Sequence, residues 1–190
     1  MSPLSKIIGL LQIDSTVGDL AGNAERLESL TAIAQANGAQ VAIATELAVC
    51  GYPPRDLLLQ PDFITTSFET AKNLAVEIPV LVGTPIPPDH ERNLPANGVV
   101  RAGVLQAVPN KDNTNRVVAK KQLLPSYDVF DETRYFTPAN RSGICRSIGE
   151  IDLGITICED AWQAAGLTPS AYGQDPVSYT HLTLPTIAVV

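Results

Sequence analysis

The sequence predicts an α/β domain, and three observations support this class. Short apolar runs rich in β-branched residues recur along the chain, as at residues 41–44 and 80–85. Longer segments with apolar residues at helical spacing lie between these runs. Clusters of glycine, proline, asparagine and aspartate separate the two kinds of segment, as turns do.

The first elements follow a strand–helix–strand order. Residues 6–13, KIIGLLQI, predict a largely buried first strand, and residues 41–44 predict a second. Residues 23–37 predict a helix between them, with Asn23 as its N-cap. The predicted buried face of this helix comprises Leu27, Leu30, Ile33 and Ala34.

The same alternation continues further along the chain. Residues 63–76 predict a second amphipathic helix, which precedes the strand at residues 80–85. Residues 98–107 and 116–120 predict a pair of strands. Residues 143–158 predict a hairpin-like pair that ends in the polar sequence Cys-Glu-Asp.

Composition narrows the classes of function. At 190 residues, with 45% apolar and 17% charged residues, the chain predicts one globular domain. A net charge of −7 without basic clusters argues against nucleic acid and membrane surfaces as partners. Three cysteines without a CxxC motif predict reduced thiols in a cytosolic protein, with neither a disulfide framework nor a metal site.

The last fourteen residues, 177–190, break the pattern of the preceding chain. They contain none of the 33 formally charged side chains, and VSYTHLTLPT resembles the translation of a sequencing-library adapter. We therefore expect residues 1–176 to be part of a native domain and residues 177–190 to be a non-native tail. The alternative is a native C-terminal strand with poor patterning.

Three apolar strands end at a chemically reactive side chain: Glu46, Lys121 and Cys158. Functional groups collect at strand ends in α/β proteins. A carboxylate base, an ammonium group and a thiol that converge there would form a thiol-based amide hydrolase. The residues alone leave alternatives open. Cys158 can be a packing thiol, and Glu46 can be a solvated carboxylate. By spacing alone, Lys120 is as good a candidate as Lys121 for the lysine of the site.

Four segments resemble the nitrilase (carbon–nitrogen hydrolase) superfamily. Their sequences are LQIDSTVGDLAGN (11–23), TELAVCGYPPRDLLL (45–59), KKQLLPSYDVFDETRYF (120–136) and GITICEDAW (154–162). Within that superfamily they are most similar to the glutaminase domain of glutamine-dependent NAD⁺ synthetases. The resemblance implies an αββα four-layer sandwich, which we expect to be incomplete because of truncation.

The resemblance also implies roles for individual residues. Glu46 would be the general base, Cys158 the nucleophile and Lys121 the oxyanion-stabilising lysine, braced by Glu132. The positions that match the family's glutamine pocket are Tyr52, Tyr127, Glu159 and Trp162. Cys50 and Cys145 match no catalytic position and are expected to be packing thiols.

The implied reaction is hydrolysis of glutamine through a γ-glutamyl thioester. The ammonia would pass to an ATP-dependent synthetase domain that amidates deamido-NAD and is missing here. The glutaminase half would need no cofactor, whereas the missing domain would use ATP and Mg²⁺. The family implies a cytoplasmic location and a homo-oligomer for the full-length protein.

Two other interpretations of the sequence remain. The chain could be a stand-alone amidase or nitrilase of the same superfamily, or a non-enzymatic α/β module in which Cys158 belongs to the core. We expect residues 1–190 alone to lack useful glutaminase activity, because an incomplete sandwich exposes sheet edges and apolar faces.

Overall fold

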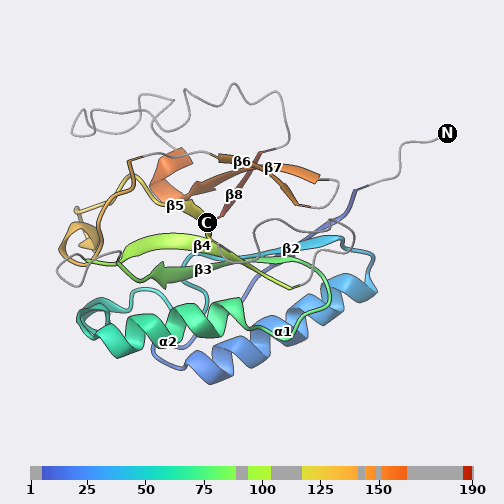
Figure 1. Cartoon of the computed structure of the whole chain (residues 1–190), viewed down its shortest axis with the longest axis horizontal. Helices are drawn as coiled ribbons and strands as arrows, with labels where there is room; N and C mark the ends of the chain where they lie inside the picture. Colours follow the sequence, from blue (N-terminus) through green and yellow to red (C-terminus); the bar gives the residue numbers. More distant parts are fainter. Residues whose placement is uncertain are drawn as a thin grey trace.

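The computed structural model confirms the predicted α/β class and stacks its elements in layers. Two helices cover one face of a five-stranded sheet, and a three-stranded sheet packs on the other face (Figure 1). The structure describes residues 6–88, 94–103, 117–140, 144–148, 151–161 and 186–189.

The five-stranded sheet has its strands in sequence order. They are β1 (Ile8–Leu11), β2 (Val41–Ala44), β3 (Val80–Ile86), β4 (Ala96–Ala102) and β5 (Val117–Lys120). The first three strands are parallel, while β3, β4 and β5 pair antiparallel. Parallel neighbours need a crossover, which α1 (Leu20–Ala36) and α2 (Pro61–Lys72) provide.

The second sheet has the order β6–β7–β8. The predicted hairpin corresponds to β6 (Ile144–Ile148) and β7 (Ile151–Ile157), which pair antiparallel. Strand β8 (Thr186–Val189) pairs parallel to β7 and lies within the segment expected to be a non-native tail. The proposed origin of that tail stays a prediction.

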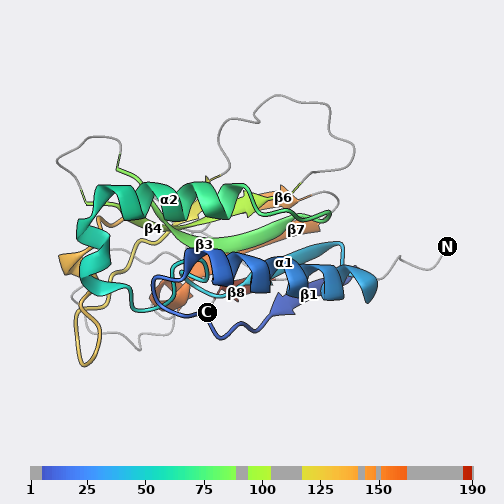
Figure 2. The same cartoon turned by 90° about the horizontal axis from the view of Figure 1, so that it is seen from below.

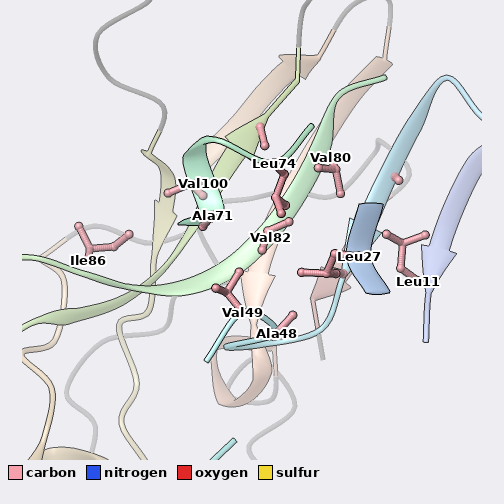
Figure 3. Packing of buried hydrophobic residues seen from close by; sticks show 13 residues of the cluster. Leu11, Leu27, Ala48, Val49, Ala71, Leu74, Val80, Val82, Ile86 and Val100 are labelled. Carbon is pink, nitrogen blue, oxygen red and sulfur yellow. The ribbon is translucent and has the colours of Figure 1, made fainter. Parts of the chain in front are cut away.

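Alternating side chains of the first sheet build two cores, because successive residues of a strand point to opposite faces. Helices α1 and α2 both lie over one face of this sheet (Figure 2). Val80 and Val82 of β3 point to that face, where they pack with Leu27 of α1 and Ala71 of α2 (Figure 3). Leu81, between them, joins the core that lies between the two sheets.

Three details of the sequence-based assignment are wrong. Helix α1 begins at Leu20 with Asp19 as its N-cap, and Asn23 is instead buried, with Nδ2 donating to the carbonyls of Thr16 and Val49. Ile33 is 59% exposed, not part of the buried face. Leu10 of the first strand is 72% exposed. Apolar character at the right spacing does not show which face a neighbouring element covers.

Among the described residues, neither helix combines the length and the apolar character of a membrane span.

Candidate active site

Glu46 follows β2 after a single intervening residue, in a tight turn. Leu47, the next residue, has a positive φ of 50°. The turn packs directly on Gly83 of β3, where an added Cβ would clash with the backbone nitrogen of Leu47. Because Gly83 has no side chain, the backbone of the turn can pack closely against β3, and this contact positions Glu46.

Lys121 follows β5 immediately and is fully buried. Its Nζ lies 2.8 Å from Oε1 of Glu46 and 2.8 Å from Oε2 of Glu132. Burial favours the neutral amine, but the carboxylates of Glu46 and Glu132 outweigh it and raise the pKa of Lys121. The charged form of Lys121 is therefore favoured, whereas the adjacent Lys120 is half-buried and takes no part in these ion pairs.

Glu132 begins the short 3₁₀ helix η2 (Glu132–Arg134) and is buried. Besides Lys121, it contacts Tyr52, whose hydroxyl donates a 3.0 Å hydrogen bond to Oε1. Burial raises the pKa of Glu132, Lys121 opposes that rise, and Glu46 adds to it. Two carboxyl groups thus share one ammonium group.

Cys158 follows β7 and starts the 3₁₀ helix η3 (Cys158–Ala161) with a φ of 47°. A positive φ is uncommon in a residue with a side chain and often occurs at functional turns. Burial raises the pKa of the Cys158 thiol to about 11; the charge of Lys121 opposes that rise, and Glu46 and Glu132 add to it. The Glu159 backbone N–H also bonds to Cys158 and lowers that pKa. Cys158 is therefore a neutral thiol at rest.

Asp160 connects the turn after Cys158 to the segment after Lys121. Its carboxylate accepts hydrogen bonds from the backbone N–H groups of Gln122 at 3.1 Å and Leu123 at 2.7 Å. Burial raises the pKa of Asp160 to about 6, against these hydrogen bonds, which lower it. One buried carboxylate thus holds the end of β7 against the chain that leaves β5.

The structure describes three of the four residues predicted to contact substrate. Tyr127 donates a 2.7 Å hydrogen bond to Oε2 of Glu159. Oε1 of Glu159 is buried and has no hydrogen-bond partner among the described residues. Tyr52 contacts Glu132, as described above. Trp162 lies outside the described residues.

A pocket of about 310 Å³ opens beside Glu46 and Tyr52. The other residues that line it are Ile13, Asp14, Ser15 and Thr45. The pocket gives a small molecule access to Glu46, at the carboxyl end of a parallel strand, where ligands of α/β sheets commonly bind. In the described part of the chain, no group of three or more His, Cys, Asp or Glu side chains is arranged to hold a metal ion.

The structure therefore brings together the four predicted catalytic residues: Glu46, Lys121, Glu132 and Cys158. Sequence reasoning missed Asn97, whose Nδ2 donates a 2.6 Å hydrogen bond to Oε1 of Glu46. The available signal was an asparagine directly before the small and apolar residues Gly98, Val99 and Val100 of strand β4. The thiol of Cys50 is fully buried, and burial raises its pKa to about 12.

Comparison with known proteins agrees with this arrangement. The family described as Carbon-nitrogen hydrolase matches residues 7–174. The chain belongs to this family. Membership makes the chain homologous to enzymes that cleave carbon–nitrogen bonds, and supports a hydrolase.

Among curated carbon–nitrogen hydrolase relatives, two glutamine-dependent NAD(+) synthetases are representative. The one from Synechocystis sp. is 39% identical over 159 residues, covering 82% of this chain and 28% of the relative. The one from Thermotoga maritima is 32% identical over 172 residues, which cover 86% of this chain and 27% of that relative. The chain thus spans little more than a quarter of the length of these relatives.

Solved structures show the same fold. One is the glutamine-dependent NAD⁺ synthetase from Acinetobacter baumannii in complex with ADP, with 26% sequence identity and a TM-score of 0.67. The match covers 83% of this chain and 28% of the synthetase chain. Another is an amidase from Nesterenkonia sp. AN1, with 22% sequence identity and a TM-score of 0.61. This match covers 80% of this chain and 55% of the amidase chain. The predicted nitrilase-type fold is therefore confirmed.

Proposed function

We propose that this carbon–nitrogen hydrolase cleaves a carboxamide through a thioester on Cys158, with Glu46 as the base. The observation that carries the proposal is the buried Lys121 ammonium group, paired at 2.8 Å with Glu46 and electrostatically coupled to Cys158. Few structural roles require a buried lysine between two carboxylates beside a neutral thiol.

The first half of the reaction forms the thioester. Cys158 gives its proton to Glu46 while the sulfur attacks the carbonyl carbon, and the carbonyl π-electrons move onto oxygen. Lys121 and the backbone N–H of Glu159 stabilise the resulting oxyanion. Glu46 then returns the proton to the amide nitrogen, the C–N bond breaks, and ammonia leaves.

The second half releases the acid. Water attacks the thioester carbon and gives a proton to Glu46, so that a new oxyanion forms next to Lys121. The C–S bond breaks, and the sulfur takes the proton back from Glu46. The pKa of about 11 explains why a base is required, since the thiol is protonated at neutral pH.

Glutamine is the proposed substrate, as a source of ammonia for amidation of deamido-NAD by a synthetase. Identity of 39% to a glutamine-dependent NAD(+) synthetase supports this choice. The unpartnered Oε1 of Glu159 also supports it, because a buried carboxylate suits the ammonium group of an amino-acid substrate. ATP and Mg²⁺ would serve the synthetase reaction, and the cysteine chemistry needs neither.

Alkylation by iodoacetamide tests the proposal, because it needs the nucleophile and its surroundings but not a complete turnover. We expect Cys158 to react near neutral pH much faster than Cys50 in the same chain, as followed by mass spectrometry of the two peptides. Glu46→Gln should slow alkylation of Cys158 by about 10²-fold, the lower range for loss of a general base. Glutamine, but not asparagine, should protect Cys158.

Two results would contradict the proposal. If Cys158 reacts no faster than Cys50 in folded protein, Cys158 is a core thiol. If short aliphatic amides protect Cys158 and glutamine does not, the reaction class stands but the substrate is a simple amide.

A further inference from the structure

Asn97 is a buried polar residue near the start of strand β4 in the first sheet. It is 1% exposed and belongs to β4, where it lies opposite Pro85 of β3. Its side chain donates to Glu46 at 2.6 Å, and its backbone carbonyl accepts a 2.7 Å hydrogen bond from the N–H of Lys121. One residue therefore contacts both the proposed base and the proposed oxyanion lysine.

The orientation of the Asn97 amide follows from its neighbour. Oδ1 is buried and has no hydrogen-bond partner among the described residues, while Nδ2 bonds to a carboxylate. Rotating the amide by half a turn would set its carbonyl oxygen against the carboxylate of Glu46, which is repulsive. An amide whose oxygen stays unsatisfied so that its nitrogen can donate suits a functional rather than a packing role.

Both hydrogen bonds that Glu46 accepts from described residues end on the same oxygen, Oε1. One comes from Asn97 and the other from Lys121 at 2.8 Å. Two donors that converge on Oε1 fix the plane of the carboxylate and leave Oε2 as the atom that can take a proton.

We propose that Asn97 is a positioning residue that holds Oε1 of Glu46 so that Oε2 faces the thiol of Cys158. The inference rests on the proposed function, because it assigns Asn97 a role only if Glu46 is the base. The titratable groups around Glu46 belong to several elements: Asp14, Tyr52, Lys121, Glu132 and Cys158.

Two substitutions test the role by the pH dependence of Cys158 alkylation. Asn97→Asp has nearly the same shape but places a second carboxylate against Glu46, and two carboxylates in contact retain a proton. We expect alkylation at neutral pH to fall by about tenfold or more and its pH midpoint to rise by about one unit. Asn97→Leu removes the donor without adding charge and should slow alkylation by about tenfold, with an unchanged midpoint.

Thr84→Val is the matched control. Thr84 is a fully buried residue of the neighbouring strand β3, and its hydroxyl has no hydrogen-bond partner among the described residues. It should leave both rate and midpoint unchanged, so a rate loss in Asn97→Leu cannot be ascribed to any buried polar-to-apolar change. Circular dichroism shows whether each variant is folded, and Asn97→Leu carries the test if Asn97→Asp does not fold.

The outcomes separate the two claims. Suppose that Glu46→Gln slows alkylation, but Asn97→Asp keeps the wild-type pH midpoint or Asn97→Leu keeps the wild-type rate. The inference about Asn97 is then wrong, and the proposed function stands. If Glu46→Gln itself has no effect, the proposed function fails and the role of Asn97 fails with it.

Discussion

The backbone N–H of Leu123 donates a 2.7 Å hydrogen bond to Oδ1 of Asp160 and thereby links the two sheets. Leu123 lies two residues after Lys121, and Asp160 lies two residues after Cys158. The hydrogen bond therefore sets the separation between the lysine of one sheet and the thiol of the other. Neither residue is one of the proposed reacting groups, yet their contact holds the two groups' segments together.

Asp160 gives a prediction for the pH dependence of stability. Burial raises its pKa from 3.8 to about 6, so the folded chain holds this proton more tightly than the unfolded chain. Acidification therefore stabilises the fold through Asp160, and this contribution is lost as the pH rises through the folded-state value. From about pH 4.5 to 7, the wild type should lose roughly 2 kcal/mol of unfolding free energy relative to Asp160→Asn.

Urea unfolding of both proteins at the two pH values measures this difference. The exposed Asp128→Asn removes the same charge at the surface and serves as the matched control, which should show no comparable difference. A wild type that gains stability relative to Asp160→Asn as the pH rises would contradict the assignment.

Lys121 and Lys120 are a natural pair for comparison. Lys121→Met leaves the carboxylates of Glu46 and Glu132 without their shared cation, and removing one partner of a buried ion pair costs about 3–5 kcal/mol. Lys120→Met changes a half-buried side chain outside the ion pairs and should cost less than about 1 kcal/mol. Denaturant unfolding measures both values.

The same pair should differ in reactivity. The charge of Lys121 lowers the pKa of Cys158 against its burial, so Lys121→Met should raise that pKa and slow alkylation. Lys120→Met should alkylate at the wild-type rate. Equal effects of the two substitutions would mean that the geometry of Lys121 has no functional meaning.

Gly83→Ala should impair the site without altering any of its polar groups. The added Cβ would meet the backbone of the turn at residues 45–47, which must then move away from β3 and take Glu46 with it. We expect alkylation of Cys158 to slow by about tenfold or more, as displacement by about 1 Å can cost 10²-fold in rate.

Gly38→Ala is the control for a general loss of stability. Gly38 has a φ of 87° and follows the C-terminal end of α1, so alanine there strains the backbone and costs about 1 kcal/mol. It should lower the melting temperature and leave the alkylation rate unchanged. A normal rate in folded Gly83→Ala would show that Glu46 does not depend on this packing.

Strand ends were the part of the site that the sequence could predict. The sequence alone shows the apolar runs that end at Glu46, Lys121 and Cys158. Glu132 was added because its surrounding motif resembles that of the superfamily. Asn97 could not be assigned in this way. Its contact with Glu46 depends on how β4 lies beside β3 and β5, and the sequence does not state that register.

Errors in the fold assignment have the same physical origin. Asn23 is a good N-cap residue by type, but Asp19 occupies the cap, and the amide of Asn23 instead satisfies carbonyl groups of two loops. Local propensity recognises which residues can cap a helix, whereas tertiary contacts decide which residue does. Ile33 and Leu10 are exposed for a related reason, since burial depends on the neighbouring element and not on the side chain alone.

The division of the site between two sheets has a consequence for biosynthesis. Glu46, Lys121 and Glu132 all precede β6 and β7 in the chain, so they leave the ribosome before Cys158 does. The ion-paired cluster can close while the thiol is still being translated. The nucleophile then gains its partners only when the hairpin of β6 and β7 docks on the first sheet.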